Sequence, residues 1–182
     1  MPLSKQDIAK EYQPFISVQD YSKKPVIDGV QIVEIPVFTS EDGDFSELAR
    51  LTKDGTLESF PNVQVRQINR SLVVPGSIKA WHFHLKQDEV QSILPGDKLL
   101  VGLWDLRENS KTKGQTMRLA LGGGKAHWIY IPKGVAHGYM NPYKKPATVI
   151  YFVSEQFDMK DPDELRMPWD SMGKEFWSIS KE

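Results

Sequence analysis

The chain has 182 residues, of which 40% are hydrophobic and 26% are charged, and its formal net charge is −1. This balance indicates one globular domain with a core of its own, and it argues against a nucleic-acid partner and against disorder. The absence of an apolar run of about 18 residues argues against a membrane span. The lack of cysteine excludes disulfides and thiolate chemistry and fits a cytoplasmic location, as does an N-terminus without the apolar centre of a secretory signal.

Residues 1–25 are polar and mixed, and they predict an N-terminal arm that packs against the body or against a second subunit. Ser4 to Tyr12 is expected to form a short helix after a serine cap. From residue 26 the chain changes to short runs rich in valine, isoleucine and aromatic residues, separated by turn sequences such as VPGS, LPGD and GGGK. Many short strands at near-regular spacing predict an all-β sandwich or closed barrel over residues 26–160.

Two local features interrupt this pattern. The segment FSELARLT (45–52) predicts one further weak helix, and GGGK (122–125) predicts a hairpin turn rather than a phosphate loop. Residues 161–182 are expected to form a C-terminal cap that places Trp169 and Trp177 against the barrel.

The four histidines are His82, His84, His127 and His137. On a strand, His82 and His84 lie on the same face, so both imidazoles enter one cavity if that face points inward, and both are exposed if it points outward. His127 fits no motif and is expected to be structural.

Two spaced motifs contain the other three histidines. Gly76, His82, His84, Glu89 and Gly96 form G-x5-H-x-H-x4-E-x6-G, and Pro132 to Asn141 contains P-x-G-x2-H-x3-N. Together these motifs resemble the cupin superfamily, whose fold is a double-stranded β-helix, or jelly-roll barrel. In metal-binding cupins the matching positions are ligands, which implies one divalent transition metal held by His82, His84, Glu89 and His137.

A second resemblance extends over residues 27–178. The segments DGDFSEL, VRQINRSL, GSIKAWHFH, WDLRENSKTKGQ, WIYIPKGVAHGY, IYFVSEQFD and MPWDS are similar, in order, to the dTDP-4-dehydrorhamnose 3,5-epimerase family, a metal-free branch of the cupins. This resemblance implies a nucleotide-sugar substrate, no cofactor and a homodimer. It also implies epimerisation by proton exchange next to a ketone, with His82 as the base, Tyr151 as the acid and His137 as a second histidine of the site.

The same resemblance suggests residues that bind substrate. Gln67, Asn69 and Arg70 lie in the strand beside the family's substrate wall, and Arg70 is either a phosphate contact or part of a surface ion pair. Lys79 stands where the family has an arginine, and it meets a phosphate as a point charge. Tyr139 and Trp81 are candidates to stack on a base or sugar, although core packing is favoured for Trp81.

Two departures from the family keep other interpretations open. The stretch after the base lacks the family's lysine, with Lys86 the nearest, and the aspartate partner of the base has no counterpart after Trp177. Glu89 and Glu155 are the candidates to replace that aspartate. The alternatives are therefore a metal-dependent cupin enzyme, such as an oxygenase or isomerase, and a non-catalytic cupin that binds a sugar nucleotide.

Overall fold

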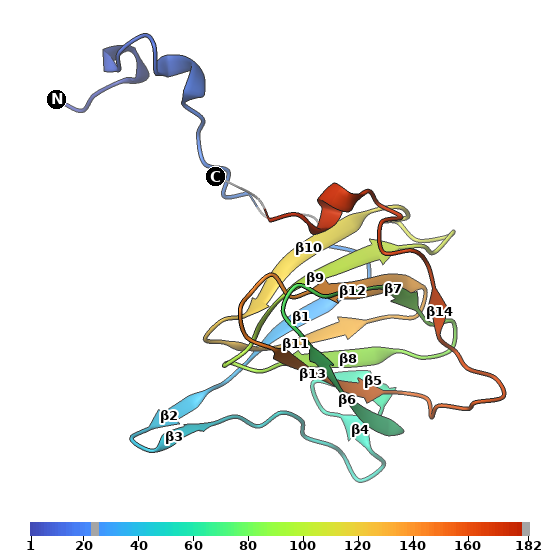
Figure 1. Cartoon of the computed structure of the whole chain (residues 1–182). Coiled ribbons are helices and arrows are strands. Elements are labelled where there is room, and N and C mark those ends of the chain that lie inside the picture. Colours follow the sequence, from blue (N-terminus) through green and yellow to red (C-terminus); the bar gives the residue numbers. More distant parts are fainter. Residues whose placement is uncertain (23–25, 180–182) are drawn as a thin grey trace.

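The computed structural model describes residues 1–22 and 26–179 and shows two five-stranded antiparallel sheets that enclose one core (Figure 1). The last three residues of the expected arm and of the expected cap lie outside this description. The first sheet has the order β1 (Gln31–Ile35), β11 (Ala126–Ile131), β8 (Glu89–Ile93), β13 (Ala147–Val153), β6 (Gln67–Val73). The second has the order β10 (Thr116–Gly122), β9 (Lys98–Asp105), β12 (Val135–Met140), β7 (Ile78–Phe83), β14 (Leu165–Arg166). The expected all-β cupin jelly roll is confirmed.

Two small hairpins flank the sheets. They are formed by β2 (Phe38–Ser40) with β3 (Gly43–Phe45), and by β4 (Thr56–Leu57) with β5 (Phe60–Gln64). The short helical turns are η1 (Lys5–Asp7), η2 (Gln13–Phe15) and η3 (Lys174–Trp177). No helix in the described part of the chain is long and apolar enough to cross a membrane.

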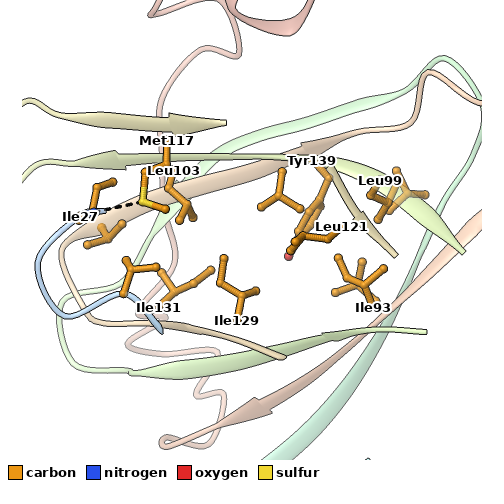
Figure 2. Close-up of a cluster of buried hydrophobic side chains, with 14 of the residues drawn as sticks. Ile27, Ile93, Leu99, Leu103, Met117, Leu121, Ile129, Ile131 and Tyr139 are labelled. Carbon is orange, nitrogen blue, oxygen red and sulfur yellow. Dashed lines mark hydrogen bonds between the residues drawn. The ribbon is translucent and has the colours of Figure 1, made fainter. Parts of the chain in front are cut away.

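The side chains between the two sheets follow the alternation of a β-strand. On β9, Leu99, Val101 and Leu103 point into the barrel, whereas Leu100 lies on the outer face in a different cluster. Figure 2 shows part of the inner cluster, which Tyr139 joins. Towards the other end of the barrel, the inward positions of β6, β7 and β8 are polar. These polar side chains line a cleft.

The C-terminal segment covers the outer face of the second sheet, as expected for a cap. Trp177 is 1% exposed, and its ring centroid lies 5.0 Å from that of Trp81. A Cβ on Gly102 would lie 2.6 Å from the Trp177 ring, so a glycine is needed for this close approach. Trp169 remains 38% exposed and contributes its main-chain carbonyl, which accepts a hydrogen bond from Trp177 Nε1.

Three local expectations are not met in full. In the region Ser4 to Tyr12 the serine cap is confirmed, since Ser4 caps η1, but the helix is only this single turn, because a segment this short has no buried face to stabilise a longer helix. No residue of η1 or η2 is buried, and the arm projects away from the body (Figure 1), so the expected packing against the body is wrong, while packing against a second subunit stays a prediction. Residues 45–52 form no helix: Phe45 ends β3, and Leu48 and Ala49 pack against the hydrophobic cluster outside the first sheet.

The GGGK turn does not close a hairpin ladder. β10 pairs with β9, whereas β11 pairs with β1 and β8, so the turn carries the chain from one sheet to the other. Gly122, Gly123 and Gly124 all have positive φ, and a Cβ on Gly122 would lie 2.1 Å from the carbonyl oxygen of Asp97. His127 accepts a hydrogen bond from the Gly122 amide (3.2 Å), which gives it a structural contact in this corner.

Candidate active site

A cleft of about 720 Å³ opens at the polar end of the barrel. Its floor and sides come from the inward faces of β6, β7 and β13, and one side is completed by residues 155–166, which we call the wall segment. A cleft of this size accommodates a ligand of several rings. The residues singled out from the sequence that line it are Gln67, Asn69, Lys79, His82, His84, Lys86, Glu89, Tyr139, Tyr151 and Glu155.

His82 and His84 point inward, as one of the two sequence interpretations required. His82 lies opposite His137 of β12 and opposite Arg166 of β14, and its ring centroid is 4.2 Å from that of His137. Burial lowers the pKa of His82 well below its usual value, and nearby His137 lowers it further. His82 is therefore a neutral imidazole at neutral pH, the form that accepts a proton.

Tyr151 enters the cleft from β13, in the other sheet. The ring of Tyr139 lies between the two predicted catalytic groups, with its centroid 6.2 Å from that of His82 and 6.4 Å from that of Tyr151. Burial raises the pKa of Tyr151, while interactions with the hydroxyls of Tyr139 and Ser71 act against that rise. The phenol is therefore protonated at neutral pH, the form that delivers a proton.

Glu89 and His137 form an ion pair in the cleft floor. Glu89 Oε1 lies 2.7 Å from His137 Nε2, and the same oxygen accepts a hydrogen bond from Gln91 Nε2 (2.5 Å). Burial alone would raise the pKa of Glu89, but the charge and hydrogen bond of His137, aided by His84 and His82, lower it to about 2. Burial would lower the pKa of His137, and Glu89 raises it instead.

The wall segment is fastened to the turn that follows β7. The carboxylate of Asp163 accepts hydrogen bonds from the amides of Leu85 (2.8 Å), Lys86 (2.8 Å) and Gln87 (2.9 Å). The main-chain carbonyl of Asp163 accepts a hydrogen bond from Nδ1 of His84, which leaves Nε2 of His84 towards Glu89 at 3.8 Å. One residue thus fixes both the wall segment and the ring of His84.

The remaining predicted binding residues separate into two groups. Gln67 and Asn69 share the inward face of β6, where Gln67 Nε2 donates to Asn69 Oδ1 (2.7 Å). Lys79 also lines the cleft, and its ammonium donates to Ser71 Oγ at 2.8 Å. Arg70 alternates onto the outer face of β6, is exposed and does not line the cleft. Trp81 is fully buried beneath the cap, outside the cleft.

The structure brings together three of the four residues in the expected metal set. Within the described residues, ligand atoms of His84, Glu89 and His137 all lie within 4.8 Å of one another, and His82 is not part of this group. Two imidazoles and a carboxylate are a donor set that suits first-row transition metals. Of the two carboxylates considered as partners for the base, Glu89 interacts electrostatically with His82, and Glu155 lies in the wall segment.

Sequence reasoning missed several residues that shape this cleft. The run VAHGYM was read only as part of a motif, whereas it forms β12, the strand that supplies both His137 and Tyr139. Ser71, Asp163 and Arg166 had not been singled out. The alternation after Gln67 and Asn69 on one strand was a signal for Ser71, but nothing in the sequence indicated that residues 163 and 166 return to β7.

The fold and the cleft define the class of this protein: a cupin barrel with a candidate base and a candidate acid on opposite sides of one polar cavity. The model of the dTDP-4-dehydrorhamnose 3,5-epimerase family matches residues 24–179. The chain belongs to the dTDP-4-dehydrorhamnose 3,5-epimerase family, and by family it is an epimerase of nucleotide-linked keto-sugars.

Two curated relatives cover most of both chains. The chain is 41% identical over 145 residues to the spore coat polysaccharide biosynthesis protein SpsL of Bacillus subtilis, which covers 80% of this chain and 91% of SpsL. It is 30% identical over 146 residues to the probable low-salt glycan biosynthesis epimerase Agl13 of Haloferax volcanii, which covers 80% of this chain and 90% of Agl13.

Solved structures agree with the family. A dTDP sugar isomerase of Desulfovibrio desulfuricans superposes with a TM-score of 0.70 at 25% identity, covering 85% of this chain and 91% of that one. RmlC of Legionella pneumophila, a dTDP-6-deoxy-D-glucose-3,5-epimerase in complex with dTDP-4-keto-L-rhamnose, superposes with a TM-score of 0.64 at 25% identity, covering 78% of this chain and 73% of that one.

Proposed function

We propose that this protein epimerises a nucleotide-linked 4-keto-6-deoxyhexose at a carbon next to the ketone, with His82 as the base and Tyr151 as the acid. The observation that carries the proposal is the pair itself. A half-buried, neutral imidazole and a protonated phenol enter one cleft from opposite sheets, on either side of Tyr139.

In this mechanism His82 removes the proton from the carbon next to the C4 ketone, and the bonding pair moves into an enolate. Tyr151 then donates its proton to the opposite face of the same carbon, the C4 carbonyl re-forms, and the configuration is inverted. The developing negative charge needs a cationic or donating group nearby. Lys79, Lys86 and Arg166 are cations that line the cleft, and Arg166 pairs with the candidate base across β14 and β7. We propose that Lys79 and Arg166 serve the enolate and the diphosphate.

The remaining polar wall is suited to sugar and nucleotide hydroxyls. Gln67 and Asn69 present amide groups on the same face of β6, next to Ser71. The complex of the Legionella enzyme with dTDP-4-keto-L-rhamnose supports a substrate of this class for the present cleft.

The test is solvent deuterium wash-in. We expect a dTDP-4-keto-6-deoxyhexose incubated with the protein in D₂O to take up deuterium at C3 or C5, seen by NMR. His82→Asn and Tyr151→Phe are expected to reduce uptake about 10³-fold. His127→Asn is the matched histidine control, because His127 lies at the turn between the sheets and not in the cleft, and it is expected to keep full activity.

Wash-in at the wild-type rate in His82→Asn would contradict this mechanism. Binding of the nucleotide sugar without any uptake by the wild-type protein would favour the non-catalytic alternative, in which a cupin binds the nucleotide sugar without turnover.

A second candidate function is metal-assisted isomerisation or oxygenation, and the grouping of His84, Glu89 and His137 is what favours it. A divalent metal held by these three would polarise a bound carbonyl as a Lewis acid. We nevertheless propose a cofactor-independent reaction, because the Glu89 carboxylate is already engaged by His137 and Gln91. Elemental analysis of protein purified without chelator tests this choice: near-stoichiometric transition metal that is lost in His84→Ala would favour the metal candidate.

We also propose that the protein acts as a homodimer in the cytoplasm, where a charged nucleotide sugar would meet it. Exposed aromatic side chains on the β2–β3 hairpin, Phe38 at 62% and Phe45 at 65%, support a second copy as the group that covers them. Light scattering coupled to size-exclusion chromatography is expected to give the mass of a dimer, and Phe38→Ser with Phe45→Ser is expected to shift it towards the monomer.

A further inference from the structure

Ser71 lies beside the candidate acid on one side of the cleft. It belongs to β6 and pairs with Val149 of β13, while Asn69 pairs with Tyr151 further along the same ladder. Residues two apart on a strand share a face, so Ser71 and Tyr151 are diagonal neighbours across the two strands. Both side chains line the cleft, and their hydroxyls interact as hydrogen-bond partners. The proposed mechanism has so far given Ser71 no role.

The Ser71 hydroxyl is held from its other side by a lysine. Lys79 Nζ donates a hydrogen bond to Ser71 Oγ at 2.8 Å. Because Lys79 lies on β7 in the second sheet and Ser71 on β6 in the first, this contact joins the two sheets. A hydroxyl oxygen that accepts from an ammonium keeps its own O–H group free to donate. The donor of Ser71 is therefore available to the oxygen of Tyr151.

Lys79 differs from the other cations of the cleft. Lys86 and Arg166 each pair with a carboxylate of the wall segment. In the part of the chain that the structure describes, Lys79 makes no such ion pair, and its hydrogen bond goes to Ser71. An ammonium that no carboxylate neutralises polarises the hydroxyl that it contacts and strengthens the hydrogen bond which that hydroxyl donates. Through Ser71, Lys79 therefore favours negative charge on the oxygen of Tyr151.

The proposed reaction places such a charge on this oxygen. Once Tyr151 has given its proton to carbon, it is a phenolate in a half-buried position, and a fixed donor nearby is needed to stabilise it. Burial raises the pKa of Tyr151, and hydrogen bonds with Tyr139 and Ser71 act against that rise. Of these two partners, Ser71 is the one that a cation holds in place.

We propose that Ser71 is a positioning residue for the acid: with Lys79 behind it, its O–H group directs the Tyr151 oxygen towards the substrate carbon and stabilises the phenolate that remains after proton delivery. Ser71 keeps its own proton throughout, so no bond of Ser71 breaks and the proton balance of the reaction is unchanged. Ser71 acts through Tyr151 and not on the reacting carbon. This inference rests on the proposed function.

The enolate that His82 forms has two fates in D₂O. After its proton has exchanged with solvent, His82 returns deuterium to the same face of the carbon, and the original configuration is retained. Alternatively Tyr151 delivers deuterium to the opposite face, and the configuration is inverted. A residue that acts through Tyr151 changes the ratio of inversion to retained wash-in. A residue that only supports the cleft lowers both rates together.

The experiment compares Ser71→Val with Ser71→Thr, which have nearly the same shape and differ in the hydroxyl. NMR of a dTDP-4-keto-6-deoxyhexose in D₂O measures inversion and retained wash-in separately. We expect Ser71→Val to lower the ratio of inversion to retained wash-in about tenfold, the effect of losing one hydrogen bond of ordinary strength. Ser71→Thr is expected to keep the wild-type ratio. KM is expected to stay close to the wild-type value in both variants, because the substrate does not depend on Ser71 for binding.

Two further variants complete the design. Ser71→Ala also lacks the hydroxyl and is smaller than serine, so it gives the same comparison if valine does not fit, and thermal unfolding shows which variants fold. Ser77→Ala is the serine control. The Ser77 hydroxyl donates to the carbonyl of Val74 (2.6 Å) in the turn between β6 and β7 and does not line the cleft, so the wild-type ratio is expected.

Two results would overturn the inference. One is an unchanged ratio in folded Ser71→Val or Ser71→Ala, whether both rates persist or both fall together. The other is a ratio in Ser71→Thr as low as that in Ser71→Val, because the hydroxyl would then not be the responsible group. A wild-type protein that neither inverts the sugar nor takes up deuterium would instead refute the proposed function, so the two failures are distinguished.

Discussion

Glu89 Oε1 lies 2.7 Å from His137 Nε2, and both side chains are almost wholly enclosed, with 3% and 1% of their surface exposed. The pair joins the two sheets, since Glu89 begins β8 and His137 belongs to β12. The His137 ring centroid also lies 4.2 Å from that of the candidate base His82, so loss of the pair is expected to affect both the fold and the cleft.

Breaking this pair is expected to destabilise the protein. Glu89→Gln leaves a buried imidazole without its counter-charge, which we expect to lower the free energy of unfolding by about 3 kcal/mol in urea titrations at pH 7. Glu34→Gln removes an exposed carboxylate from Lys125 and is the control, with little expected change. Equal stability of the two variants would contradict the assignment of a strong pair.

The same pair predicts the pH dependence of stability. The pKa of Glu89 falls from 4.5 to about 2 on folding, so its contribution is complete above pH 4.5 and is lost as the pH falls towards 2. The pKa of His137 rises above 6.5, so the same interaction is complete below pH 6.5 and is lost as the pH rises through that higher value. Urea unfolding across pH is expected to show both slopes in the wild type and smaller slopes in Glu89→Gln, where other carboxylates of lowered pKa, such as Asp163, still contribute at acid pH.

The pH dependence of activity follows from His82. Because its pKa lies well below 6.5 in the folded protein, the base stays neutral at pH 6, and kcat/KM for proton exchange is expected to remain on its plateau there. The rate is expected to fall only at lower pH, where the imidazole becomes protonated. A loss of activity centred at pH 6.5 or above would show that His82 keeps an ordinary pKa or is not the base.

Loss of the Asp163 carboxylate is expected to lower the stability of the protein and to loosen the turn that follows β7. Asp163→Ala removes the acceptor of three backbone hydrogen bonds and is expected to cost about 2 kcal/mol. Hydrogen exchange at residues 85–87 should quicken in this variant. Asp161→Asn, which removes a carboxylate from an exposed pair with Lys86, serves as the control. Equal exchange in the two variants would argue against a stabilising role for the Asp163 hydrogen bonds.

Gly138 is expected to tolerate no side chain. A Cβ there would lie 2.4 Å from the Cβ of Ala80 and 2.7 Å from the carbonyl oxygen of Lys79, so β12 and β7 would be forced apart. Gly138→Ala is expected to lower stability by about 2 kcal/mol and to reduce wash-in activity. Gly96→Ala meets nothing within 4 Å and is the matched control, measured by thermal unfolding.

The strands that could be predicted are those with a strong local pattern. The runs that became β9, β11 and β13 are rich in branched and aromatic residues, and each is buried on both faces of its sheet. β12 was missed because its residues include His137, Gly138 and Tyr139, which read as a site motif and not as a strand. The helix expected at 45–52 failed because the packing of Leu48 and Ala49 against the outer cluster outweighed a weak local preference.

The candidate site also combines features that the sequence predicted with features that it did not. The spacing of His82, His84, Glu89 and His137 along the chain predicted the barrel fold through its resemblance to the cupins. Short strands with fixed alternation leave little freedom in where those side chains point. The sequence alone therefore determined the class of fold and predicted which residues are the candidate base and the candidate acid.

The tertiary structure decided how those residues divide their roles. It paired Glu89 with His137, set Tyr139 between His82 and Tyr151, and turned Arg70 away from the cleft. It also brought Asp163 and Arg166 back to β7 from about 80 residues further along the chain. These contacts join strands in different sheets or segments far apart in sequence, so they depend on sheet order and register, which no local pattern of residues encodes.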